Sequence, residues 1–174
     1  MEEPEIELET RREIFNIIKE YPGLNMRAIE RKTGMVLNLV KYHLQKLEEM
    51  ELVNKIEEEG YNRYYPEKYP GERLDYKDKR LLGLLRNETP LGIVVYLLNN
   101  RGKAKHKEIR DALDLPASTL SYHLKKLKRK NVIKKTDSFY KIIDEKHISH
   151  LLLEYGPPDD VVERFVEVWE DFVL

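Results

Sequence analysis

The helix predicted over residues 117–130 has side chains suited to binding a polyanion. The residues spaced to share its inward face are Leu120, His123, Leu124 and Leu127. The opposite face carries Ser118, Tyr122, Lys125 and Arg129, with Ser121 beside them. Hydroxyl groups form hydrogen bonds with base edges and phosphates, whereas Lys and Arg attract phosphate by charge. The pattern therefore indicates a face that binds nucleic acid.

The distribution of charge along the chain supports this interpretation, although the total does not. With 31 basic and 32 acidic residues among 174, the net charge is only −1. Residues 101–135, however, hold twelve basic and three acidic residues, a net charge of +9, whereas residues 144–174 have a net charge of −7. Such a basic field suits a phosphate backbone. Outside the helix, the candidate DNA contacts in this region are Lys105, Lys107, Lys134 and Lys135.

The sequence contains an internal repeat. Residues 40–47, VKYHLQKL, recur as LSYHLKKL at residues 120–127, an offset of 80 positions. The same offset places Ile29 on Ile109 and the pair at 52–53 on the pair at 132–133. A pattern sustained over so many positions without gaps indicates a duplicated structural unit.

Each unit predicts the same order of elements. In the second, Thr89-Pro90 should cap and open a helix to about residue 100, followed by helices over 106–113 and 117–130. Asp114, like Gly34 in the first unit, suits a left-handed turn between the last two helices. Extended segments over 132–136 and 139–143 predict a β-hairpin, matched by 52–56 and 61–65 in the first unit. This order is that of a winged helix-turn-helix.

The predicted fold is mainly α-helical with small β-hairpin wings. We expect a first winged helix-turn-helix domain over 1–68, a linker and connecting helix over 69–88, and a second such domain over 89–144. Residues 145–174 should form C-terminal helices over 145–155 and 159–172. The last helix has a wide apolar face that needs a partner, and a homodimer through these helices is one hypothesis.

A family resemblance accompanies these patterns. The segment 115–127, LPASTLSYHLKKL, resembles the recognition-helix signature of ArsR/MarR-like winged-helix regulators, with Pro116 where the family has an N-cap serine. The duplicated layout resembles that of archaeal transcription regulators with two such domains in one chain, over residues 7–145. The resemblance implies a sequence-specific regulator that binds double-stranded DNA and is not an enzyme. The alternative is a protein-docking module of the transcription or replication machinery.

A recognition helix presents its N-terminal residues to base edges in the major groove. The candidate base-reading residues are therefore Ser118, Thr119, Ser121 and Tyr122. Lys125, Lys126 and Arg129 are candidate phosphate contacts, which position the protein without reading sequence. Binding of RNA or single-stranded DNA is a third hypothesis, for which Tyr122 is the main support.

The first unit leaves two interpretations open. The same projection gives Asn38, Tyr42 and Gln45 on its outward face, with Lys41 beside them. Asn and Gln can read adenine, and exposed apolar residues such as Val36 can pack on thymine methyl groups. The face also includes Glu49, which repels phosphate, and the wing tip reads Glu57-Glu58-Glu59. This unit either reads DNA weakly beside the second, which we favour, or has become a surface for a protein partner or for dimerisation.

Composition excludes several other classes. Without cysteine there are no disulfides, thiolate nucleophiles or Cys-ligated metals, and the common nucleotide-binding and hydrolase motifs are missing. We expect no cofactor, no membrane association and a cytoplasmic location; the scarcity of Cys and Gln, with abundant Glu and Lys, is typical of a thermophile. His147, His150 and Glu154 have spacing that a zinc site could use, but such spacing is also common by chance, and no metal is our preferred interpretation.

Overall fold

The computed structural model describes residues 5–67 and 74–174. The chain divides into two compact units, Met1–Gly83 and Leu84–Leu174. This division lies within the segment 69–88 that the sequence assigns to the linker and connecting helix, of which residues 69–73 are outside the described part. The C-terminal helices belong to the second unit rather than forming a region of their own. The fold is mainly helical with small antiparallel β-hairpins, as predicted.

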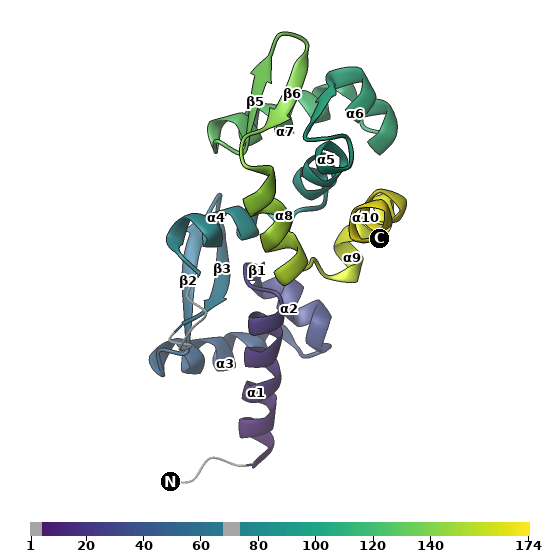
Figure 1. Ribbon diagram of the computed structural model, residues 1–174. Helices are drawn as coiled ribbons and strands as arrows, with labels where there is room; N and C mark the ends of the chain where they lie inside the picture. Colours follow the sequence, from purple (N-terminus) through teal and green to yellow (C-terminus); the bar gives the residue numbers. More distant parts are fainter. Residues whose placement is uncertain (1–4, 68–73) are drawn as a thin grey trace. The chain divides into compact units, whose positions relative to one another are not determined.

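The first unit has the helices and the wing that the sequence predicts (Figure 1). Its helices are α1 (Glu5–Glu20), α2 (Met26–Thr33), α3 (Leu37–Glu49) and α4 (Tyr76–Leu85), the last of which extends past the division. Its strands are β1 (Leu24–Asn25), β2 (Val53–Glu58) and β3 (Tyr61–Pro66). The sheet order is β1-β3-β2, with both pairings antiparallel.

The second unit repeats this arrangement and adds helices after it. Its repeated elements are α5 (Glu88–Asn99), β4 (Lys103–Lys105), α6 (His106–Leu113), α7 (Ala117–Arg129), β5 (Ile133–Thr136) and β6 (Phe139–Ile142). The sheet order is β4-β6-β5. The added elements are α8 (Glu145–Glu154), α9 (Asp159–Val162), the 3₁₀ turn η1 (Glu163–Phe165) and α10 (Val166–Val173). In Figure 1 the β5–β6 hairpin projects from the second unit with its turn at the extremity.

Three sequence expectations need correction. Each sheet has a third strand, β1 or β4, which is too short to leave a periodic pattern in the sequence. Helix α5 begins at Glu88 after the N-cap residue Asn87, so Thr89 lies inside the helix rather than capping it. The helix expected over 159–172 is divided by the 3₁₀ turn into α9 and α10.

Residues in left-handed conformation end the short helices and form the wing turns. Gly34 (φ 71°) ends α2 and Asp114 (φ 49°) ends α6, and each donates its N–H to a carbonyl of the last turn. Glu59 and Gly60, both at positive φ, form the two-residue turn of the first wing. Positive φ at both positions matches the right-handed twist of the strands.

The inward residues of the repeat form the two cores. In the first unit Val40, Leu44 and Leu47 of α3 are buried with Ile14 and Ile18 of α1. In the second, Leu120, Leu124 and Leu127 of α7 are buried, as is Ile109 of α6. His43 is fully buried and His123 half-buried, so both lie on the inward side as expected.

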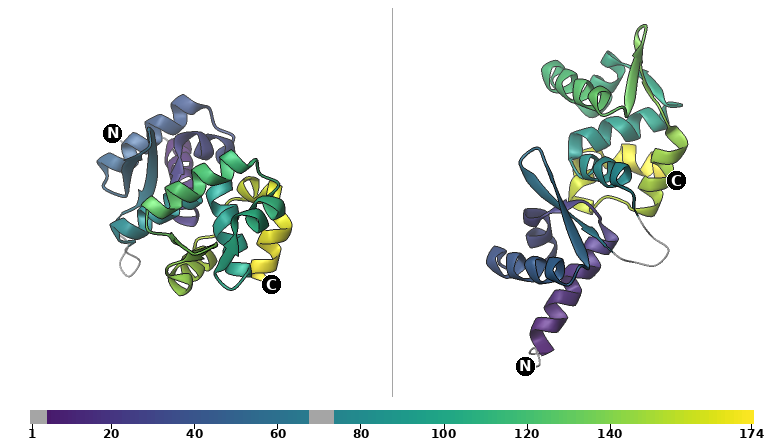
Figure 2. Two further views of the ribbon diagram at one scale, coloured as in Figure 1. Left: turned by 90° about the horizontal axis from the view of Figure 1, so that it is seen from above. Right: turned by 90° about the vertical axis from the view of Figure 1, so that its left-hand side faces the viewer.

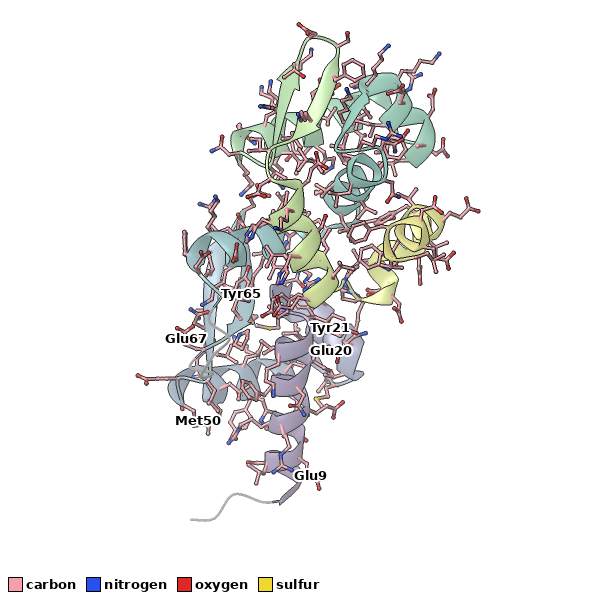
Figure 3. The ribbon with its side chains drawn as sticks, viewed as in Figure 1. Glu9, Glu20, Tyr21, Met50, Tyr65 and Glu67 are labelled. Atoms are coloured by element: carbon pink, nitrogen blue, oxygen red, sulfur yellow. The ribbon has the colours of Figure 1, made fainter. Side chains whose placement is uncertain are left out.

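Helix α4 packs on the sheet of the first unit. The Tyr65 hydroxyl of β3 donates a hydrogen bond to the Lys79 carbonyl at 2.6 Å, and the Lys79 ammonium pairs with Glu67 at 3.0 Å (Figure 3). The closest approach is at Gly83, where an added Cβ would lie 2.6 Å from the Tyr65 hydroxyl oxygen and 2.8 Å from Arg63 Cδ. Only glycine fits this position without a shift of its neighbours.

The apolar face of the C-terminal helices finds a partner within its own unit. Phe165 and Val162 are buried, and an added Cβ on Gly92 of α5 would lie 3.2 Å from the Phe165 ring. Asn99 of α5 donates a side-chain hydrogen bond to the Val168 carbonyl of α10 at 2.8 Å. Part of the face that suggested a homodimer is therefore covered by α5.

Among the described residues, no single helix is long and apolar enough to cross a membrane. The bent pair α4 and α5 meets the length and composition criteria only when its two helices are taken together.

The packing at Gly83 predicts that Gly83→Ala destabilises the first unit. Alanine at a helical position normally stabilises a protein by up to about 1 kcal/mol, but overpacking against Tyr65 and Arg63 should cost about 1–3 kcal/mol and outweigh this gain. Chemical denaturation followed by circular dichroism measures the difference. Gly156→Ala, whose Cβ would meet nothing closer than 3.9 Å, is the control. Equal stability of both variants and the parent protein would contradict the prediction.

Candidate nucleic-acid interface

Helix α7 exposes the face that the sequence predicts. Because Leu120, Leu124 and Leu127 are buried, the residues on the opposite side of the helix face outward. Tyr122 is 60% exposed and stands edge-on to the half-buried His123, with ring centroids 5.0 Å apart. The other exposed candidates on this helix are Ser118, Ser121, Lys125 and Arg129, whereas Thr119 is half-buried.

Lys126 does not belong to this exposed face. It is only 7% exposed, which contradicts its assignment as a phosphate contact. Lys126 lies three residues after His123 and therefore flanks the inward side of α7. A long lysine stem at such a position packs along the apolar surface. The adjacent Lys125 is the exposed member of the pair.

The exposed cations of the second unit have few acidic partners. Within the described residues, Lys107, Lys125, Arg129 and Lys134 form no ion pair, whereas Arg110 pairs with its neighbour Asp111 at 3.2 Å. The charges gather around α7 from α6 and the wing. Figure 2 shows α7 beside the β5–β6 hairpin that carries Lys134 and Lys135. Exposed cations without an ion pair are available to bind an external polyanion.

Aromatic rings orient the remaining lysines of the wing. The ammonium groups of Lys103 and Lys105 lie 5.3 and 5.5 Å from the Phe139 ring centroid, and that of Lys135 lies 5.6 Å from Tyr140. A ring face attracts a cation without neutralising its charge. These lysines are therefore held near the strands while keeping their attraction for phosphate.

The start of α7 is well defined despite the missing serine cap. Pro116 is the N-cap residue, with extended backbone (φ −58°, ψ 141°), and the helix begins at Ala117. Val36 occupies the matching position before α3 and likewise gives no side-chain cap. Ser118 is therefore the second helical residue and is exposed, where the sequence places it.

A contact between α6 and α7 was not predicted. The His106 ring, at the first position of α6, shares a hydrogen bond with the Ser121 hydroxyl, with Nε2 and Oγ 3.0 Å apart. His106 and Ser121 are fifteen residues apart on different helices, so no periodic pattern in the sequence reveals the pair. One of the candidate base-reading groups is therefore already hydrogen-bonded.

The candidate DNA contacts of the first unit are also exposed, but acidic residues lie beside them. Asn38, Lys41 and Gln45 are exposed and Tyr42 is 41% exposed. Three of the basic residues around α3 are paired with acids: Lys46 with Glu49 at 3.0 Å, Lys55 with Glu48 at 3.3 Å, and Arg27 with Glu30 at 2.9 Å. The Gln45 amide also donates to Glu49, at 3.4 Å. This face combines neutralised charges with the 70% exposed Val36.

The acidic wing tip is only partly turned outward. Glu57 and Glu59 are exposed, but Glu58 is 8% exposed and pairs with Arg80 of α4 at 3.4 Å. Arg63 lies buried nearby and donates to the Gly23 carbonyl at 2.9 Å. Burial lowers the pKa of Arg63 from its usual value, and the neighbouring Tyr65 and Glu58 partly oppose this. Glu58 is thus a structural residue of the sheet.

The histidines of α8 do not assemble with acids into a cluster. The His150 ring lies 3.4 Å from Glu154, and the His147 backbone N–H is bound by the Asp144 carboxylate that caps the helix. Across residues 5–67 and 74–174, no group of three or more His, Cys, Asp or Glu side chains is placed to hold a metal ion.

Comparisons with known proteins match each unit to a helix-turn-helix family model. Residues 8–74 match the family model of an N-terminal HTH domain, and residues 88–135 match the bacterial regulatory protein family arsR. Over 135 residues, 78% of this chain, the sequence is 33% identical to an uncharacterised HTH-type transcriptional regulator of Methanocaldococcus jannaschii. The matched part is 32% of that relative, so this chain spans about a third of its length.

The base of the first wing should respond to alkaline pH through Tyr64. Tyr64 is 2% exposed, and burial, reinforced by the charge of Glu48, raises its pKa above the usual 10.0. The folded state therefore retains the phenolic proton where the unfolded chain loses it. The stabilisation is fully present below the unfolded pKa and is lost as pH rises through the folded pKa.

Tyr64→Phe should therefore reduce the loss of stability at alkaline pH. Urea midpoints of the parent and the variant are measured between about pH 9 and 11. The lysines titrate in both proteins, so the difference between the two pH profiles reports the contribution of Tyr64. Parallel pH profiles would contradict the assignment to Tyr64.

Proposed function

Since the chain carries two helix-turn-helix domains in tandem, the second of the arsR family, we propose that it is a sequence-specific transcription regulator that binds double-stranded DNA. The second unit provides the dominant contact and the first assists it. Two reading heads in one chain can serve as the two subunits of a dimeric regulator do. The proposed activity is binding rather than catalysis.

The observation that carries this proposal is that the two units share one fold but differ in whether their exposed cations form ion pairs. Around α7 the exposed cations Lys125, Arg129 and Lys134 have no ion-pair partner among the described residues, whereas around α3 the cations Lys46, Lys55 and Arg27 are paired. A polyanion is attracted to the surface around α7 without having to break existing ion pairs. Neutralised phosphates supply most of the non-specific affinity for DNA.

The proposal assigns different roles along α7. Ser118, Ser121 and Tyr122, near its N-terminus, are the proposed base-reading residues, with the half-buried Thr119 beside them. The proposed phosphate contacts are Lys125 and Arg129 on α7, Lys105 and Lys107 at α6, and Lys134 and Lys135 on the wing. Lys126 is omitted because it is buried.

A homodimer through the C-terminal helices is a secondary proposal. Although α5 covers part of their apolar face, Leu153, Val166 and Val173 remain 64%, 44% and 46% exposed. The mass in solution, measured by light scattering, distinguishes a monomer from a dimer.

Salt-dependent binding tests the role of α7. Lys125→Ala and Arg129→Ala should each weaken binding to all duplexes alike and reduce the slope of log K against log salt by about 1, because each removes one phosphate contact. Mobility shifts or fluorescence anisotropy across a salt series measure the slope.

The control is Lys146→Ala, which removes an exposed lysine of the same unit from the acidic helix α8. Its slope should equal that of the parent. Absence of binding to any duplex at low salt would exclude the proposal. Binding that is insensitive to Lys125 and Arg129 would favour a winged helix that docks protein, for which the exposed Val36 of the first unit is the supporting observation.

The first unit is tested by removing its outward acid. If α3 lies near phosphate, Glu49→Ala should strengthen DNA binding about 3- to 10-fold at low salt, because it removes a like charge and releases Lys46 from its ion pair. Glu9→Ala, at an exposed position of α1 (Figure 3), is the control. Unchanged affinity in Glu49→Ala would place α3 away from DNA.

A further inference from the structure

His106 and Ser121 lie where three elements of the second unit meet. His106 is the first residue of α6, and Ser121 is on the exposed face of α7. The His106 ring also lies 6.5 Å from the ring of Tyr140 on β6. The start of α6 is fixed by a capping interaction in which the Lys105 backbone N–H donates to Glu108 at 2.7 Å. The imidazole is thus anchored beside the recognition helix.

The imidazole restricts what the Ser121 hydroxyl can do. A serine hydroxyl has one hydrogen to donate and two lone pairs that accept, and it rotates freely unless a neighbour fixes it. If Nε2 carries a hydrogen, Ser121 accepts from the ring and its own hydrogen remains available to an acceptor such as purine N7. If Nε2 is bare, Ser121 donates to the ring and presents only lone pairs, which suit an amino group of adenine or cytosine.

We propose that His106 is a positioning residue for base recognition, fixing the direction of the Ser121 hydroxyl and thereby the base that α7 reads at this point. This inference rests on the proposed function. It adds His106, which lies outside the recognition helix, to the residues that determine base specificity. His106 acts through Ser121 and contributes hydrogen-bond direction rather than charge.

The first unit lacks this pair. At the offset of 80, His106 corresponds to Met26 and Ser121 to Lys41, and a thioether cannot orient an ammonium group as imidazole orients a hydroxyl. The packing of the two units is nevertheless alike, since α2 and α6 begin at equivalent positions. The first unit therefore forms the same arrangement of helices without such a pair, which is consistent with a role for the pair beyond packing.

Selection of bound duplexes from a random pool tests the proposal. His106→Phe, which keeps a ring at this position, should reduce discrimination at one base pair by about 3- to 10-fold, the effect of one hydrogen bond. Preferences at other positions and the salt slope should not change. Ser121→Ala should lose the preference at the same base pair, and adding His106→Phe to it should cause no further loss.

Two further variants complete the design. His106→Gln, which retains donor and acceptor groups, should restore discrimination in part. His150→Phe is the matched control, since it replaces an exposed histidine of α8 in the same unit. Circular dichroism of each variant verifies folding.

The outcomes separate this inference from the proposed function. If His106→Phe binds with parent affinity and unchanged base preference, the positioning role is wrong while DNA binding stands. If His106→Phe weakens binding to all sequences alike, the role is also wrong. If the parent protein selects no duplex at all, the failure lies in the proposed function.

Discussion

Burial of one leucine-rich face orients α3 and α7, and the exposed chemistry of the protein depends on this constraint. Leu120, Leu124 and Leu127 are almost fully buried, and each such side chain contributes roughly 1.5–3 kcal/mol when removed from water. Rotating α7 to expose a different face would sacrifice several of these contributions together. The groups on the opposite side of α7, among them Ser118, Lys125 and Arg129, are consequently presented outward.

Electrostatics then distinguishes two surfaces that packing makes alike. In the first unit, Glu49 pairs with Lys46 and Glu48 pairs with Lys55, so these four charges compensate one another. At positions 125 and 129 the second unit has cations where the first has Gln45 and Glu49. Exposed ion pairs contribute little to stability, so their gain or loss leaves the fold intact. The charge of this surface could therefore differ between the units while the core remained the same.

The sequence predicts most of the fold because periodicity and turn chemistry act locally. The 3.6-residue spacing in α3 and α7, together with Gly34 and Asp114 at the turns, is sufficient to place the helices and wings. Strands β1 and β4 were missed because two or three residues give no recognisable alternation. The break at η1 was missed because the apolar spacing continues across it.

The errors at the candidate site have a different physical origin. Lys126 was expected outside because lysine is charged, yet its long stem lets it pack beside the core. The sequence places Glu58 in the acidic wing tip, yet its side chain is buried and pairs with the exposed Arg80 of α4. The His106–Ser121 pair likewise joins residues from separate helices. In the last two cases the deciding contact is tertiary, so a helical projection cannot show it.

The duplication shows that the exposed surface of a unit can change while its core is kept. Residues that pack, such as Leu44 and Leu124 at an offset of 80, are the same type in both units and are buried in both. Residues that face outward, such as Lys41 and Ser121, differ and are exposed in both. Because surface substitutions usually change stability by less than about 0.5 kcal/mol, the outward positions can vary independently of the core. Net charge averaged over the chain conceals this division, since the acidic C-terminal helices offset the basic surface around α7.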